Sequence, residues 1–426
     1  MFLASSCGDL APSQPTATTE QKPRATKAVT ADKIRHVNVL VDLSGGMAGF
    51  VHPNAPGESG SDFQQTITAL LSDVQAQTPS AYYFVEQAKT AGGNVLRQTT
   101  YADLSKVVSQ GAPQYAAGTE MPEMLRQAVK MQAAAPGTVN IIVSDFIYGP
   151  QDQQQVWRVR TDVKEALTSS APLALSVYAG TSEFRGNFYP GTRHKAQALR
   201  GSKIPYYVWV LGEPALVAQA NAQLLASLAD RPQVHFNHAA QTPPHGVLTN
   251  YEAQGSWFVE PNTSPGTPGV VFSDLSKQEP ARFVVGLDLH ALPKAVREQF
   301  TATALELDPA TTNAQLQRTW EAGEAGAPKL PAAASRQGYT HFAQVSVSKV
   351  PSSEAAAIIT LRLPNTGTAL PGWVAAYSTL NDDNIAQQGG KTFRLTEVLQ
   401  GAQDAFTRKT NATAPVWQAP VALRLD

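Results

Sequence analysis

The feature that most constrains this fold is an alternation, between residues 36 and 230, of short apolar segments with segments of helical periodicity. The apolar segments are rich in β-branched residues and lack polar alternation, which is typical of strands buried on both faces. They lie at residues 36–41, 81–88, 139–146, 173–180 and 206–212, and helices are predicted at 62–76, 122–135, 151–168 and 213–230. Alternation of this kind predicts a doubly wound α/β domain over residues 35–230 with a mainly parallel sheet.

The second half of the chain has a different pattern. Several segments alternate apolar and polar residues with period 2 and are separated by Pro, Gly and Ser, which favours strands with one buried face. They include residues 281–292, 300–308, 342–350 and 356–364. We expect a β-rich, sandwich-like domain over residues 240–426, and a helix at 392–406 that docks onto one of the domains. Two domains also suit a chain of 426 residues.

Composition excludes several classes of protein. The net charge of -1 and the pI near 6.7 provide no basic field for a phosphate backbone, so nucleic acid is not an expected partner. No apolar run reaches the 18 or so residues of a membrane-spanning helix. The single cysteine, Cys7, excludes a disulfide framework or a multi-cysteine zinc site within one chain.

The first residues resemble the end of a bacterial lipoprotein signal. Small residues precede Cys7, and a stretch rich in Pro, Thr, Gln and Ser follows it to residue 31. A charged n-region and most of an apolar h-region are missing from this stretch. We interpret residues 1–31 as a signal remnant and a disordered tether, with Cys7 as the lipidation site. Localisation at the bacterial cell envelope follows, with the lipid as the only contact with the membrane.

Three motifs follow one another along the α/β half. Asp42, Ser44 and Gly46 lie in VDLSGGM directly after the first strand, Thr119 precedes a helix, and Asp145 follows a later strand. The order and residue types resemble the von Willebrand factor A family, whose first motif is Asp-x-Ser-x-Ser and whose second and third motifs supply a threonine and an aspartate. Gly46 departs from this pattern, because it stands where the family has its second serine.

The resemblance covers residues 35–230 and implies a Rossmann-like fold with a metal site at the carboxyl ends of the strands. The implied ligands are Asp42, Ser44, Thr119 and Asp145, which offer the oxygen atoms that Mg²⁺ prefers, and Ca²⁺ or Mn²⁺ would also suit them. One coordination position would remain open for a carboxylate of a protein partner. The implied function is non-enzymatic protein binding or adhesion, with the missing hydroxyl at Gly46 lowering the affinity for metal.

Other interpretations stay open. Asp42 and Ser44 could cap a turn, Thr119 could cap the helix at Pro122, and Asp145 could simply end a strand, which needs no ion. The chain would then be an intracellular regulatory or scaffold subunit with a metal-free fold. A hydrolase with a site in the β-rich half is a third alternative, although the G-x-S-x-G and H-E-x-x-H signatures are absent.

Two further clusters are interpreted as structural. The aspartates of LNDDN, Asp382 and Asp383, precede Gly389 and Gly390 without the spacing of a phosphate loop, so a solvated turn is predicted. The aromatic residues of the segment 206–212 lie within an apolar strand and are predicted to pack in the core rather than to form a recognition patch.

Overall fold

The computed structural model describes most of the chain from residue 33 onward. The described ranges are 33–52, 59–88, 93–148, 153–192, 195–237, 242–264, 266–292, 305–309, 312–332, 337–351, 356–364, 370–407 and 415–426. The predicted tether at residues 1–31 and the predicted lipidation site Cys7 lie outside the described residues. None of the helices in these ranges has the length and hydropathy that crossing a membrane requires.

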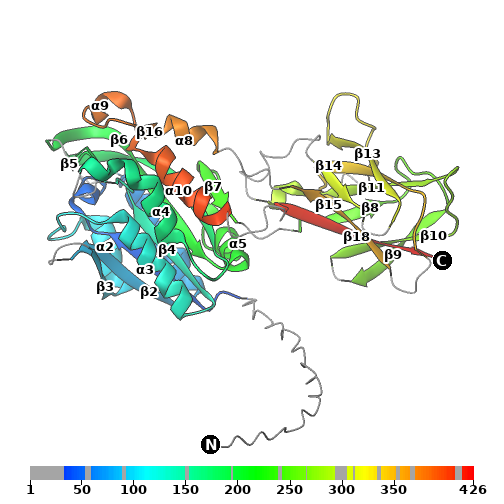
Figure 1. The fold of residues 1–426 in the computed structure, drawn as a ribbon, viewed down its shortest axis with the longest axis horizontal. Coiled ribbons are helices and arrows are strands. Elements are labelled where there is room, and N and C mark those ends of the chain that lie inside the picture. Colours follow the sequence, from blue (N-terminus) through cyan, green and yellow to red (C-terminus); the bar gives the residue numbers. More distant parts are fainter. Residues whose placement is uncertain are drawn as a thin grey trace, which may run out of the picture. The chain divides into compact units, whose positions relative to one another are not determined.

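A seven-stranded sheet forms the centre of the α/β part, with strand order β3-β2-β1-β4-β6-β5-β7 (Figure 1). The strands are β1 (His36–Asp42), β2 (Ser80–Gln87), β3 (Asn94–Thr99), β4 (Thr138–Ser144), β5 (Ala174–Phe188), β6 (Gln197–Gly212) and β7 (Gln233–Phe236). Every residue of β4 is buried, as is nearly all of β1, which explains why apolar residues predominate in these segments. The strands predicted from the sequence are therefore confirmed.

The sheet is mixed, and the prediction of a mainly parallel sheet is wrong. β1 pairs in parallel with β2 and β4, whereas the β2–β3, β4–β6, β5–β6 and β5–β7 ladders are antiparallel. The difference arises because β5 leads into β6 through a long hairpin, and the few residues between them cannot form the crossover that a parallel pair needs. In this extension, residues 181–188 alternate between more and less buried positions.

Helices cover both faces of this sheet. They are α1 (Asp62–Gln77), α2 (Tyr101–Gln110), α3 (Met121–Ala134), α4 (Val159–Leu167) and α5 (Pro214–Gln223), with short 3-10 helices η1 (Gly45–Phe50), η2 (Gln153–Arg158) and η3 (Ala226–Leu228). Tyr206 packs against Phe63 of α1, with ring centroids 5.1 Å apart. The next residue, Tyr207, and Trp209 belong to the core cluster on the opposite face, beneath α3 and α4. The core packing predicted for these aromatic residues is confirmed by their burial.

The second half is rich in strands. A five-stranded sheet has the order β12-β15-β18-β10-β9 and a four-stranded sheet the order β13-β14-β11-β8. The strands are β8 (His245–Leu248), β9 (Trp257–Ser264), β10 (Thr267–Phe272), β11 (Ala281–Leu287), β12 (Glu306–Asp308), β13 (Ala314–Glu321), β14 (His341–Val347), β15 (Ala357–Leu363) and β18 (Trp417–Leu425), with η4 (Leu289–Ala291) after β11. Residues of both sheets, such as Phe272 of β10 and Phe283 of β11, share one hydrophobic cluster. β18 lies within the larger sheet and was not predicted.

A segment near the C-terminus joins the α/β part. It comprises α8 (Gly372–Ala376), β16 (Ser378–Thr379), α9 (Ile385–Gln388), β17 (Thr392–Phe393) and α10 (Leu395–Thr407). The helix predicted at 392–406 corresponds to α10, which packs beside α4, and Leu395, Val398 and Leu399 enter the α/β core cluster (Figure 1). Residues 372–407, which the sequence analysis placed within 240–426, thus contribute to the core of the α/β part, and the chain then adds β18 to the β-rich sheets.

Asp382 is not in a solvated turn, and that prediction is wrong. Its side chain is completely buried. The carboxylate accepts hydrogen bonds from the Gly191 amide (2.6 Å) and from the hydroxyl (3.1 Å) and amide (3.4 Å) of Thr192. Burial raises the pKa of Asp382, and these hydrogen bonds oppose the rise. Asp382 therefore fastens the residues that follow β5 to the C-terminal segment.

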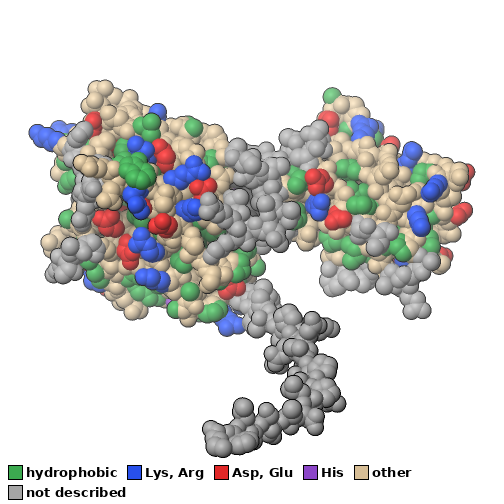
Figure 2. Space-filling view, in the orientation of Figure 1, with side chains coloured by type: hydrophobic (Ala, Val, Ile, Leu, Met, Phe, Trp, Pro, Cys, Tyr) green, Lys and Arg blue, Asp and Glu red, His purple; other side chains and the backbone are tan. Residues whose placement is uncertain are grey.

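Acidic and basic side chains are interspersed on the side of the α/β part that carries α3, α4 and α10. Figure 2 shows them in small mixed groups, with apolar side chains between them, rather than in a field of one sign. Several belong to ion pairs, such as Arg160 with Asp404 at 2.7 Å. The described residues on this face form no basic stripe of the kind that holds a nucleic acid backbone.

Candidate metal centre

The ends of two adjacent parallel strands bring the first two groups together. β1 ends at Asp42 and β4 ends at Ser144, and the register places Val41 beside Val143. The next residues of the two strands therefore meet at the same edge of the sheet. The Ser144 hydroxyl donates a hydrogen bond to Oδ2 of Asp42 at 2.7 Å.

The loop that carries Thr119 lies alongside the loop after β1. Ala116 donates its amide to the Leu43 carbonyl, and its own carbonyl accepts from the Gly45 amide, each at 2.9 Å. These contacts bring the Thr119 hydroxyl to Oδ2 of Asp42, to which it donates at 3.2 Å. Glu120 is the N-cap residue of α3, so Thr119 does not cap this helix.

Asp42 also forms a local turn. Its Oδ1 accepts a hydrogen bond from the Ser44 amide at 2.8 Å, which turns the chain sharply after β1. The capping role considered for Asp42 is thus present, together with the contacts to Ser144 and Thr119. The backbone turn and the convergence of three loops coexist at one carboxylate.

Asp145 lies directly after β4 and is also buried. Its Oδ1 accepts a hydrogen bond from the Ile147 amide at 3.2 Å. The next residue, Phe146, has a φ of 51°, a left-handed conformation that is costly for a bulky side chain. The Phe146 ring stacks on Trp209 with centroids 4.3 Å apart, and this core contact holds the backbone in place. Asp145 is therefore positioned by a strained turn that the core supports.

Gly46 allows Asp145 to reach the site. A Cβ atom at position 46 would stand 2.7 Å from Oδ2 of Asp145 and 3.6 Å from Oγ of Ser44. The Asp145 carboxylate thus occupies the space that any side chain at position 46 would need. Gly46 does more than remove a hydroxyl, because its missing side chain makes room for the Asp145 carboxylate.

The two carboxylates are desolvated and close enough to interact. Burial raises the pKa of Asp42, although its hydrogen bonds to Ser144, Ser44 and Thr119 oppose this rise. Burial and the negative charge of Asp42 together raise the pKa of Asp145 to about 7. Within the described part of the chain, the groups that shift these two pKa values most include no lysine or arginine. A bound cation would supply the missing positive charge.

The chemistry of the donor set fits a small hard cation. Two carboxylates and the hydroxyls of Ser44, Thr119 and Ser144 are all oxygen donors, the type that Mg²⁺ takes together with water. No group of three or more His, Cys, Asp or Glu side chains in the described ranges is arranged to hold a metal. Hydroxyl oxygens and water would therefore complete the coordination around Asp42 and Asp145.

All four ligands predicted from the sequence meet at one edge of the sheet. Sequence reasoning missed Ser144, which donates to Asp42 and accepts the Phe146 amide at 3.0 Å. Its position as the last residue of a predicted buried strand, immediately before Asp145, was the available signal. Comparison with family models, with curated proteins and with solved structures finds no match.

Proposed function

We propose that this chain is a non-enzymatic binding protein with a von Willebrand factor A-like domain, which holds Mg²⁺ through Asp42, Ser44, Thr119 and Asp145. The observation that carries the proposal is the convergence of three separate loops on two buried carboxylates that lack a basic partner among the groups shifting their pKa values. A bound cation would stabilise such an arrangement by balancing the negative charge of the two carboxylates. Without one, its two carboxylates repel each other in a desolvated site.

The proposed partner is a protein that presents an acidic side chain. Few protein ligands are available to the ion, so water would fill the remaining positions, and a partner carboxylate could displace one. Tyr189 lies beside the loop, because a Cβ on Gly45 would stand 3.3 Å from its ring, and half of its side chain is exposed. An aromatic ring at the rim suits a partner with an apolar residue next to its acidic one.

The proposed location is the bacterial cell envelope, with a lipid on Cys7 as the anchor. Fractionation of cells that express the full-length gene product tests this proposal. We expect the protein in the membrane fraction and the Cys7→Ser variant in the soluble fraction. Recovery of both forms from the cytosol would instead support the intracellular scaffold with a metal-free fold.

Mg²⁺ is expected to raise the melting temperature of the purified chain. A ligand that binds only the folded state stabilises it by about 2.7 kcal/mol at a concentration 100 times its Kd. The Asp145→Asn variant should lose this response because it removes a charged ligand. Asp383→Asn, a change at a carboxylate remote in sequence from the strand ends, should retain it. A wild-type melting temperature unchanged at millimolar Mg²⁺ would remove the basis of the proposed function.

Variants at Gly46 separate two explanations of this glycine. Gly46→Ala and Gly46→Ser should both weaken Mg²⁺ binding by roughly tenfold, equivalent to about 1.4 kcal/mol, because either side chain displaces the Asp145 carboxylate. Gly118→Ala is the matched control, since a Cβ there comes no closer than 3.9 Å to Oε1 of Gln87. If Gly46→Ser binds Mg²⁺ more tightly than wild type, the only effect of the glycine is that the site lacks one hydroxyl ligand.

A further inference from the structure

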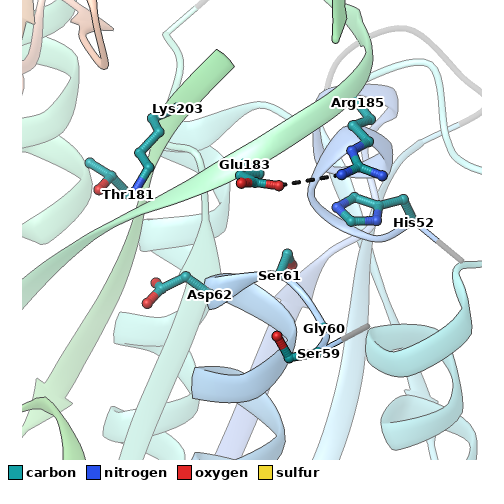
Figure 3. Close-up of a pocket in the computed structure, with 9 residues that line it drawn as sticks. All are labelled: His52, Ser59, Gly60, Ser61, Asp62, Thr181, Glu183, Arg185 and Lys203. Atoms are coloured by element: carbon teal, nitrogen blue, oxygen red, sulfur yellow. Dashed lines mark ion pairs between the residues drawn. The ribbon is translucent and has the colours of Figure 1, made fainter. Parts of the chain in front are cut away.

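A polar pocket lies between the β5–β6 hairpin and the start of α1. Its volume is about 420 Å³. Figure 3 shows Thr181, Glu183, Arg185 and Lys203 on the hairpin strands above it, and the residues at the start of α1 below it. The lining residues are His52, Ser59, Gly60, Ser61, Asp62, Thr181, Glu183, Arg185 and Lys203. None of them is a ligand of the proposed metal centre.

The charged side chains that line the pocket are two acids and two bases, and Arg231 adds one cation from outside the lining. Asp62 is paired with Arg231, whose guanidinium donates to both carboxylate oxygens at 2.7 and 3.1 Å. Glu183 forms an ion pair with Arg185 at 3.5 Å. Lys203 is exposed, and among the described residues it has no ion-pair partner, although it lies across the ladder from Glu183. Because Arg231 neutralises Asp62 and Arg185 neutralises Glu183, the charge of Lys203 is left to interact with a ligand.

His52 is the second observation that points to a ligand. Its side chain is only 8 % exposed, and neither Nδ1 nor Nε2 has a hydrogen-bond partner. In Figure 3 its ring lies near the Arg185 guanidinium and extends toward the space between Glu183 and Ser61. Leaving a buried polar group unpaired is destabilising, so buried polar groups in native proteins are almost always hydrogen-bonded. A ligand with acceptor oxygens would satisfy this imidazole.

The positive end of α1 contributes to the same pocket. Ser61 caps the helix by accepting the Gln64 amide at 3.2 Å, and the Ser182 hydroxyl accepts the Phe63 amide at 3.1 Å. α1 has 16 residues, so its dipole favours negative charge at this end. Asp62, which would oppose an anion here, is already neutralised by Arg231.

We propose that this pocket binds a small molecule through an oxyanion group, a phosphate or a carboxylate, with Lys203 and His52 as its principal donors. Arg185 stands at the rim and contributes positive potential. The site goes beyond the proposed metal-dependent function, because it shares no ligand with the metal centre and needs no Mg²⁺.

The test uses the full chain without divalent metal, titrated with inorganic phosphate and, separately, with acetate at constant ionic strength. Ring ¹⁵N signals of histidine report on His52, and the His52→Gln variant assigns its signal among the 8 histidines. We expect the His52 signal to shift with at least one probe. The probe that binds more tightly identifies the class of oxyanion.

Variants then assign the binding to this pocket. Lys203→Gln changes an exposed residue and should weaken binding by about tenfold, the loss of one charged hydrogen bond. Lys130→Gln removes an exposed lysine on α3 and should leave affinity unchanged. Asp145→Asn should also bind the probe normally, which separates this site from the metal centre. An unmoved His52 signal with both probes, or equal affinity in Lys203→Gln and wild type, would overturn the proposal.

Discussion

Replacing Asp382 with alanine is expected to lower the free energy of unfolding by roughly 3 kcal/mol. The substitution leaves the amides of Gly191 and Thr192 without their acceptor, and each unsatisfied buried donor costs about 1–3 kcal/mol. The tie between the residues after β5 and the C-terminal segment would also be lost. Urea denaturation measures the change in stability, and hydrogen exchange should show the largest loss of protection in the β5–β6 hairpin.

Two variants control for the chemistry of this contact. Asp382→Asn keeps an acceptor oxygen and should cost less than Asp382→Ala. Asp383→Ala removes a hydrogen bond from the Thr192 hydroxyl at 2.7 Å, but the Asp383 side chain is partly exposed, so water can replace it at a cost below about 1 kcal/mol. If Asp382→Ala lowers the free energy of unfolding no more than Asp383→Ala does, the hydrogen bonds of the buried carboxylate do not stabilise the fold.

Replacing Asp145 with asparagine is expected to stabilise the metal-free protein at pH 8 by roughly 2–4 kcal/mol. The pKa of Asp145 rises from 3.8 to about 7 on folding, so its charged form is disfavoured in the folded state. Each pKa unit corresponds to about 1.4 kcal/mol. Asparagine keeps an oxygen for the Ile147 amide and removes the repulsion from Asp42. The same substitution should abolish stabilisation by Mg²⁺.

The pH dependence follows from the direction of this shift. Between pH 3.8 and about 7 the folded protein retains a proton that the unfolded chain has released. Stability from this group is complete below pH 3.8 and is lost as the pH rises through about 7. Asp42 and Asp145 interact, so the proton belongs to the pair. Because protons compete with the metal, Mg²⁺ should stabilise wild type more at pH 8 than at pH 5.

Thermal denaturation at several pH values, with EDTA and with Mg²⁺, measures both effects. Wild type in EDTA should lose stability with rising pH, and Asp145→Asn should lose much less. If Asp145→Asn is instead less stable than wild type at pH 8 in EDTA, the aspartate is a structural acceptor rather than a vacant metal ligand. The metal-free scaffold would then be the better explanation of the site.

The sequence predicted most strands and helices of the α/β part, but not β3, α2 or β7, and it predicted the residues of the candidate centre except Ser144. Largely apolar segments such as 139–144 are stable when both faces of the strand are covered, which is why their burial could be predicted. The proximity of Asp42 and Asp145 could be predicted because each follows a segment predicted as a buried strand, and neighbouring parallel strands end at one edge of the sheet.

The periodicity of apolar residues could not predict the strand direction in the second part of the sheet. A fully buried strand has the same apolar pattern whether its neighbour is parallel or antiparallel, so residues 206–212 suited either arrangement. The connection between β5 and β6 determined their relative direction, because the two strands form one hairpin and are therefore antiparallel.

The amino-acid sequence alone determined which segments become buried strands and amphipathic helices, and which loops carry the oxygen atoms of the candidate centre, because these properties depend on neighbours within a few residues. Tertiary structure alone decided that residues 372–407 complete the α/β core, that Asp382 is buried, and that the Asp145 carboxylate occupies the space beside Gly46. Each of these depends on contacts between residues far apart in the chain. Local hydrophobic patterns carry no information about which distant segment will provide the partner.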